Sequence, residues 1–319
     1  MRSLAPFAFG VALLHLVGWG LFAWYSRSEP ALAGLGTLAY TFGLRHAFDA
    51  DHIAAIDNTA RKLLGQGGRP VGVGFYFSLG HSAVVFALTT ALALAAGPVA
   101  AAIPTMQHAG GIVGASVSGS FLLLIGVLNL LVLADIVRML RHARTGRLDW
   151  ERFDSRLLER GVFSRLALKR IANRLDASWK MIPLGAVFGL GFDTASEIGV
   201  LAVAAGVATH HVPLLAILAL PSLFAAGMSL LDTADGAFMA HAYGWALSSP
   251  VRRIYYNLTV TSLSVLVALG IGTLELLQVT VGIEGPDLGK IGALVALLFV
   301  GAASISLLYW KVRVLRSNE

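Results

Sequence analysis

Eight long apolar runs dominate this sequence and leave few choices of fold. They lie at 4–24, 31–60, 71–97, 110–137, 181–207, 214–241, 257–282 and 290–311. About 20 apolar residues in a helix are enough to cross the hydrocarbon core of a bilayer. Because backbone in lipid must satisfy its hydrogen bonds internally, each run is predicted to be a transmembrane helix. The sequence therefore predicts an all-α integral membrane protein with about eight spans, forming a single transmembrane domain over residues 1–319.

The composition agrees with a membrane protein. Only 13% of the residues are charged and the mean hydropathy is +0.74, whereas soluble domains carry about 25% charge. The chain has no cysteine, which excludes disulfides, iron–sulfur clusters and thiolate metal sites. The first run has no small-residue cleavage site, so we interpret it as a retained span.

The distribution of basic residues predicts the orientation. With the N-terminus inside, nearly all of the 24 Lys and Arg residues fall in inner segments, many of them at 138–180, while the outer loops hold Arg27 and Lys290. This is the pattern of the positive-inside rule. Both termini are then cytoplasmic, and 138–180 is a basic cytoplasmic loop lying along the inner leaflet. The basic excess is a topology signal, so we expect a multi-pass protein of the cell (inner) membrane and no nucleic-acid partner.

Ionisable side chains gather in four of the apolar runs. A charge at the centre of a bilayer costs roughly 2.5–3.5 kcal/mol, so such residues indicate function. Imidazoles beside carboxylates, without thiols, suit Ni²⁺, Co²⁺ or Zn²⁺ better than Mg²⁺ or Cu⁺. The predicted metal ligands are His46, Asp49, Asp51, His52, His81, Asp193, Glu197 and Asp232. Supporting roles are predicted for Arg45, Asp57, Asn58, Ser82, Thr194, Met228 and Asp235.

Some of these residues have simpler interpretations. Arg45 is expected to neutralise a neighbouring carboxylate, because an unpaired Arg at that depth is costly. Asp57 lies toward the cytoplasmic end of its run, where we expect it to be solvated. Glu275 in the seventh run has no evident partner.

The second run cannot serve one metal ion as a uniform helix. At 100° per residue His46 and Asp49 share a face with His52 at its edge, whereas Asp51 points nearly the opposite way. Either the helix is distorted near 49–51, which we favour, or Asp51 pairs with another helix. Small residues are expected to let the four polar helices approach closely; they are Gly80, Gly189, Gly191, Gly227 and Gly236.

Two short similarities indicate an internal repeat. The segment FDADHI at 48–53 resembles FDTASEI at 192–198, and GHS at 80–82 resembles GMS at 227–229. Runs two and three thus correspond to runs five and six. Because the offset of three spans is odd, the two units have opposite orientations in the membrane. Inverted repeats of this kind build a site near the bilayer midplane and support alternating access.

At these residues the chain resembles the nickel/cobalt transporter (NiCoT) family over essentially its whole length. The most specific element is H-x4-D-H, matched by His46, Asp51 and His52. Three further blocks match: FSLGHSAVV at 77–85, LGFDTASE at 190–197 and GMSLLDTADG at 227–236. Ala83 stands where Ser or Thr is expected, and Ser196 where Thr is expected. Ala83 removes one possible hydrogen bond beside His81, which bears on selectivity rather than on the family.

The resemblance implies a permease for Ni²⁺, Co²⁺ or both, in which His46, Asp51 and His52 are needed for transport. The metal is then cargo, so no cofactor is expected. The implied partners are the bilayer and the ion, with no ATP-hydrolysing subunit. Related efflux proteins tend to carry a histidine-rich loop, whereas 138–180 holds only His142, which favours import.

Other functions fit less well. An exporter could use the same site. A membrane metalloenzyme is disfavoured because the nine histidines are scattered and H-E-x-x-H is absent. A transporter of organic solutes would explain the fold but not the imidazole-rich site.

Overall fold

The computed structural model describes residues 4–28, 31–65, 67–94, 103–143, 176–190, 213–247, 250–282, 290–302 and 304. Every regular element in these segments is helical, which confirms the predicted all-α class. The long helices are α1 (Ala5–Tyr25), α2 (Ala31–His46), α3 (Ala50–Gly65), α4 (Val73–Leu94), α6 (Ile103–Ala143), α9 (Met181–Gly189), α11 (Leu214–Leu247) and α12 (Pro250–Val281). Short 3₁₀ turns, η1 (Pro70–Gly72) and η4 (Ser178–Lys180), precede α4 and α9, and a last apolar helix covers Lys290–Ala302.

Within the described segments, 5 helices are long and apolar enough to cross a membrane. These spans are Ala5–Tyr25, Pro70–Ala91, His108–Leu131, Leu214–Gly244 and Thr261–Val281. The chain is therefore a multi-pass membrane protein, while the count of eight spans and the side of the termini stay predictions. Helix α6 continues to Ala143, beyond the predicted end of the fourth run at 137, so the polar segment at 138–180 begins as helix.

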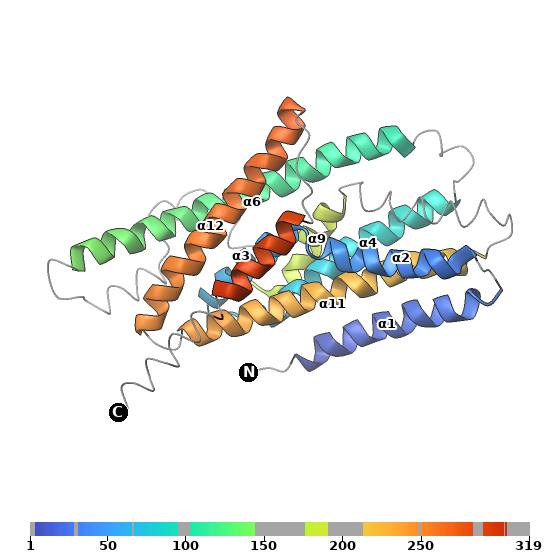
Figure 1. The fold of residues 1–319 in the computed structure, drawn as a ribbon, viewed down its shortest axis with the longest axis horizontal. Coiled ribbons are helices and arrows are strands. Elements are labelled where there is room, and N and C mark those ends of the chain that lie inside the picture. Colours follow the sequence, from blue (N-terminus) through green and yellow to red (C-terminus); the bar gives the residue numbers. More distant parts are fainter. Residues whose placement is uncertain are drawn as a thin grey trace.

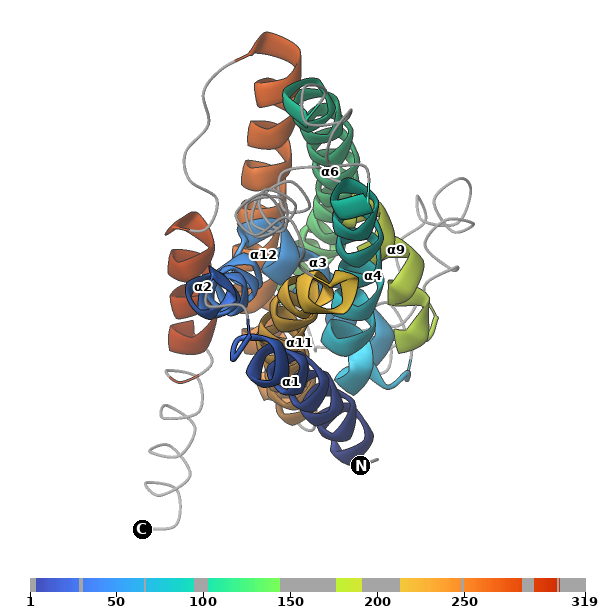
Figure 2. The same ribbon diagram turned by 90° about the vertical axis from the view of Figure 1, so that its right-hand side faces the viewer.

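Helix α11 is the centre of the helix packing (Figures 1 and 2). It contacts α1, α2, α3 and α4, while α6 packs along α12 and α9 packs along α4. Its middle is almost fully buried, including Leu220, Phe224 and Met228. A helix that is apolar and buried on most sides is expected at the core of a membrane bundle rather than at its lipid-facing rim.

Glycines set two of the closest helix contacts. A β-carbon on Gly80 of α4 would lie 2.0 Å from the carbonyl oxygen of Ile182 on α9, and one on Gly227 of α11 would lie 2.6 Å from that of Tyr40 on α2. Side chains at these positions would force the helices apart, since small residues are what allow such close packing in lipid. Gly189 and Gly236 also face neighbouring backbone closely, as predicted, whereas Gly191 lies outside the described residues.

The same two helix pairs contain a second matched contact. A β-carbon on Gly185 of α9 would lie 2.0 Å from the carbonyl oxygen of Phe77 on α4, and one on Gly43 of α2 would lie 2.1 Å from that of Phe224 on α11. Tyr40 and Gly43 on α2 have the same spacing along the chain as their counterparts on α9, Ile182 and Gly185. Phe77 and Gly80 on α4 likewise have the same spacing as Phe224 and Gly227 on α11. Helices α4 and α11 run in opposite directions (Figure 1). These equivalent contacts support the predicted inverted repeat.

The second apolar run is broken rather than continuous. Helix α2 ends at His46, and the turn that follows is closed by hydrogen bonds from the amides of Phe48 and Asp49 to the carbonyls three residues earlier, at 3.0 and 2.9 Å. The run 31–60 therefore forms two helices, and the predicted distortion near 49–51 is confirmed as a complete break. That the two helices together make one span stays a prediction. The helix Lys290–Ala302 packs on this break, because a β-carbon on Gly292 would overlap the carbonyl of Phe48.

Candidate metal-binding site

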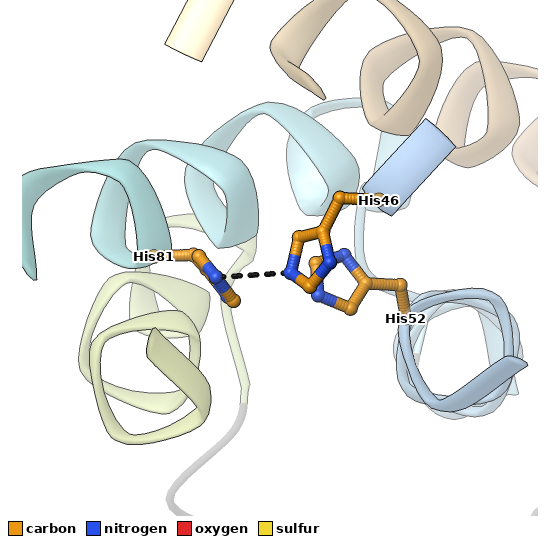
Figure 3. A group of neighbouring side chains, drawn as sticks. All are labelled: His46, His52 and His81. Atoms are coloured by element: carbon orange, nitrogen blue, oxygen red, sulfur yellow. Dashed lines mark hydrogen bonds between the residues drawn. The ribbon is translucent and has the colours of Figure 1, made fainter. Parts of the chain in front are cut away.

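Three histidines from three helices meet beside the break. His46 ends α2, His52 lies in the first turn of α3, and His81 lies in the middle of α4 (Figure 3). One ring nitrogen from each lies within 4.8 Å of the others. His52 and His81 are buried, with exposed fractions of 1% and 3%. His46 and His81 are far apart in the sequence, so their rings meet only because α2 and α4 come together in the folded protein.

The spacing of two of these nitrogens fits a shared ion. The Nε2 atoms of His46 and His81 are 3.2 Å apart. With metal–nitrogen bonds of about 2.1 Å, that separation corresponds to an angle of about 100° at the metal. This value lies between the ideal octahedral and tetrahedral angles, so both rings can bind one ion after little movement.

Carboxylates lie behind two of the rings. Asp49 Oδ2 is 2.7 Å from His46 Nδ1, close enough to accept its proton and leave Nε2 free to bind. Asp232 on α11 places Oδ2 3.6 Å from His52 Nδ1. A carboxylate behind a ligating imidazole fixes the ring's tautomer and orientation and makes it a better donor. Asp49 and Asp232 thus occupy positions that orient histidines.

Aromatic rings wall the histidine cluster. His52 stands edge-on to Phe77, with ring centroids 4.8 Å apart, and His46 lies against Phe224 at 5.7 Å. Phe77 and Phe224 are both buried, and they occupy equivalent positions in the two helix pairs. They limit the space around the imidazoles, so an ion there must exchange some of its water for ring nitrogens.

Asp51 faces a different part of the protein. Its Oδ1 accepts a hydrogen bond from the His52 amide at 2.9 Å, and its Oδ2 accepts one from Ser118 of α6 at 3.3 Å. Among the described residues, the metal-compatible group contains the three histidines without Asp51. Both alternatives from the sequence therefore hold in part, since the helix is broken and Asp51 also contacts another helix.

Among the other predicted residues, Arg45 interacts electrostatically with Asp49, while its role in neutralising a carboxylate stays a prediction. Ser82 is buried beside His81, whereas Met228 packs in an apolar cluster with Ala47 and Phe224. Predicted site residues at 193, 194 and 197 (Asp193, Thr194 and Glu197) lie outside the described residues.

Asp57 is fully buried, and the expectation that it is solvated is wrong. Its Oδ2 accepts a hydrogen bond from Arg61 at 2.8 Å, and it also accepts hydrogen bonds from Tyr243 of α11 and Ser264 of α12. Arg61 lies over the Tyr243 ring. A buried carboxylate needs such donors because burial of an unpaired charge is costly. The network ties α3 to α11 and α12 beyond the histidine cluster.

Two further predicted residues extend this polar connection. Asp235 lies one turn from Asp232 on α11 and interacts electrostatically with both Asp232 and Asp57. Asn58 donates to the Ala54 carbonyl at 2.6 Å and accepts a hydrogen bond from Asn129 of α6. Asn58 thus fastens α3 to α6 and does not reach the histidines.

Sequence reasoning missed the partners that other helices supply. Nothing in the sequence marks Tyr243 or Ser264 as a hydrogen-bond donor to Asp57, because single hydroxyl groups are common in and beside apolar runs. Ser118 was equally inconspicuous. Glu275 was noticed but had no partner, and the structure now places it within interaction range of Ser118 and Asp51.

The chain is similar to known transport proteins over most of its length. The profile of the NicO family, described as high-affinity nickel-transport protein, matches residues 32–309. The chain is 50% identical to the nickel transporter NicT of Mycobacterium tuberculosis, over 94% of this chain and 86% of that protein. It is 45% identical to the nickel transporter NixA of Staphylococcus aureus, over 97% and 94%, and 44% identical to the cobalt transport protein NhlF of Rhodococcus rhodochrous, over 84% and 78%.

No solved structure matches the chain. The family match covers most of the sequence, and the proteins named above are transporters. The prediction of a transporter rather than an enzyme is thereby confirmed, with the metal as cargo and not as a cofactor. The chain belongs to the NicO family of high-affinity nickel-transport proteins.

Proposed function

We propose that this protein is a secondary transporter that imports Ni²⁺, Co²⁺ or both, holding the ion between His46, His52 and His81. The observation that carries the proposal is the convergence of three ring nitrogens, from three helices, to within 4.8 Å. The Nε2 atoms of His46 and His81 face each other at 3.2 Å, so one metal ion can bind both of them. Imidazole suits nickel and related borderline metals. Relatives named for nickel and for cobalt support both ions as substrates.

The three imidazoles do not fill the coordination sphere of a six-coordinate ion. The remaining positions belong to water or to carboxylates that move in when the ion arrives. Asp232 is the leading candidate, because it lies beside His52 and neither of its oxygens has a hydrogen-bond partner among the described residues. Asp193 and Glu197 of the fifth run are proposed as further ligands from the other half of the repeat.

Alternating access follows from the repeat. The two glycine-packed pairs, α2 with α11 and α4 with α9, are the proposed moving units. They also meet through backbone, because a β-carbon on Gly74 of α4 would lie 1.7 Å from the Asp232 carbonyl oxygen of α11, so the pairs must pivot about that contact. The histidines lie where the pairs meet, since His46 comes from the first pair and His81 from the second. The hydrogen bonds around Asp57 block the way from the histidines along α3. Release of the ion in that direction requires the hydrogen bond between Arg61 and Asp57 to break.

The membrane potential can drive import without ATP. A divalent cation gains about 4.6 kcal/mol per 100 mV of inside-negative potential, which corresponds to roughly a thousandfold accumulation or slightly more. We therefore place the protein in the cytoplasmic membrane, without an ATP-hydrolysing subunit and with the basic segment at 138–180 on the inner side. The scarcity of histidines in that segment favours import over export.

Uptake of ⁶³Ni²⁺ in cells tests the proposal. His81→Ala and His52→Ala are expected to abolish accumulation while the protein remains in the membrane. His15→Ala is the matched control, because His15 bonds the Val11 carbonyl at 2.8 Å and the Tyr40 hydroxyl at 3.1 Å, away from the site. Wild-type accumulation in the His52 and His81 variants contradicts the ligand assignment. Lower cell-associated nickel on expression of the wild type contradicts import.

A further inference from the structure

Two carboxylates from different helices meet at one hydroxyl next to the histidine cluster. Ser118 of α6 donates to Asp51 Oδ2 of α3 at 3.3 Å. Glu275 of α12 lies within hydrogen-bonding reach of the same hydroxyl and interacts electrostatically with Asp51. Three helices therefore contribute one oxygen-bearing side chain each to this point. Neither Ser118 nor Glu275 belongs to the motifs that identified the family.

This cluster is buried. Glu275 is 2% exposed and Ser118 is 4% exposed, although both lie on helices that meet the length and hydropathy of membrane spans. Glu275 Oε2 has no hydrogen-bond partner in the part of the chain that the structure describes. A carboxylate at membrane depth without a full set of partners is costly and indicates a functional site.

Ser118 alone, the hydroxyl that the two carboxylates share in the described part of the chain, cannot satisfy both of them. A serine hydroxyl has one proton, so it can donate to Asp51 or to Glu275 but not to both. The two acids repel each other when both are charged, and a low-dielectric surrounding makes that repulsion stronger than in water. A positive ion between the acids would remove the repulsion and also use the unpaired Oε2 atom.

We propose that Asp51, Ser118 and Glu275 form a second cation site, which binds a partly hydrated divalent ion through oxygen atoms alone. The inference deepens the proposed function, on which it rests, because the ion bound here is the transported one before or after it occupies the histidines. Carboxylate, hydroxyl and water are the ligands that Mg²⁺ and Mn²⁺ accept readily, whereas imidazoles favour later transition metals. The two sites therefore differ in chemistry as well as in position.

The break between α2 and α3 makes the two sites neighbours. Asp51 and His52 are consecutive in the first turn of α3, yet their side chains reach different helices, α6 for Asp51 and α11 for His52. An ion can therefore pass between oxygen and nitrogen ligands over a short distance. Asp49 interacts with both sites, since it bonds His46 and interacts electrostatically with Glu275.

Binding of Mn²⁺ alone to the purified full-length protein in nanodiscs, followed by electron paramagnetic resonance, tests this second site. Glu275→Gln keeps the side-chain shape and removes the charge, and it is expected to weaken Mn²⁺ binding by at least about tenfold while Ni²⁺ still binds the histidines. His81→Ala should have the opposite pattern, with Ni²⁺ affinity lowered and Mn²⁺ binding retained. Asp176→Asn, on an exposed carboxylate, is the control and should change neither.

The outcomes separate this inference from the function on which it rests. Equal Mn²⁺ affinity in the wild type and in Glu275→Gln overturns the second site. If Glu275→Gln fails to fold, as loss of Ni²⁺ binding would reveal, Ser118→Ala carries the test: several-fold weaker Mn²⁺ binding supports the site, and unchanged binding overturns it. Wild-type Ni²⁺ affinity in His81→Ala would instead contradict the histidine site and leave the Mn²⁺ result standing.

Discussion

Replacement of Gly80 by alanine should disable transport although it adds only one methyl group. The new β-carbon would lie 2.0 Å from the Ile182 carbonyl oxygen, and ordinary contact begins near 3.4 Å. Helices α4 and α9 must therefore separate by roughly 1 Å or more, because two backbones cannot yield as a flexible side chain can. His81 is the next residue, and a binding site tolerates displacements of only about 0.5 Å.

The energetic terms in this substitution have opposite signs. Alanine favours the helix by about 1 kcal/mol over glycine, whereas overpacking costs typically 1–3 kcal/mol. Because Gly80 meets backbone, we expect an overpacking cost at the upper end of that range. The cost should therefore exceed the gain in helix propensity. We expect a lower thermal midpoint for the purified protein and at least a tenfold loss of ⁶³Ni²⁺ uptake.

Two further glycine variants make this prediction specific. Gly227→Ala should be similarly harmful, because Gly227 makes the equivalent contact with Tyr40 in the other helix pair. Gly34→Ala on α2 is the control, since nothing lies within 4 Å of a β-carbon there. Wild-type stability and uptake in Gly80→Ala would refute the close packing of α4 on α9. Equal losses in Gly34→Ala would show that the effect is not specific to that contact.

Three other variants test two contacts near the site and one exposed ion pair before α9. Asp49→Asn weakens the support behind His46 and should lower Ni²⁺ affinity by about 10–100-fold, measured by isothermal titration calorimetry; unchanged affinity would mean that Asp49 does not orient the ring. Tyr243→Phe removes a donor to buried Asp57 and should destabilise the protein by about 1–3 kcal/mol in chemical denaturation, whereas a neutral result would mean that water replaces the hydroxyl. Asp176→Asn breaks an exposed ion pair and should leave uptake unchanged, so a loss there would point to a role for the segment before α9.

Periodicity and motif spacing predicted the helical class and the region of the site, because each depends on local sequence. The apolar runs correspond to described helices wherever the two can be compared, except that the second run, 31–60, forms two helices, α2 and α3. The histidines were identified from their cost in lipid, and two of them, His46 and His52, lie close together in sequence. Their convergence with His81 was a prediction that the geometry supports.

The break at 47–49 could be anticipated but not placed. Helical geometry alone showed that His46 and Asp51 could not serve one ion on a uniform helix. It could not say whether the helix would end or Asp51 would turn to another partner, because that partner, Ser118, is far away in sequence. The buried state of Asp57 was misjudged for the same reason, since its donors include Tyr243 of another helix.

The central claim is that three imidazoles share one transported ion. Nickel X-ray absorption spectroscopy of the purified, Ni²⁺-loaded protein measures this directly, because imidazole rings give characteristic multiple-scattering features. We expect about three nitrogen ligands from imidazole at about 2.1 Å in the wild type and one fewer in His81→Ala. A coordination sphere of oxygen alone, or a spectrum unchanged by that substitution, would contradict the account.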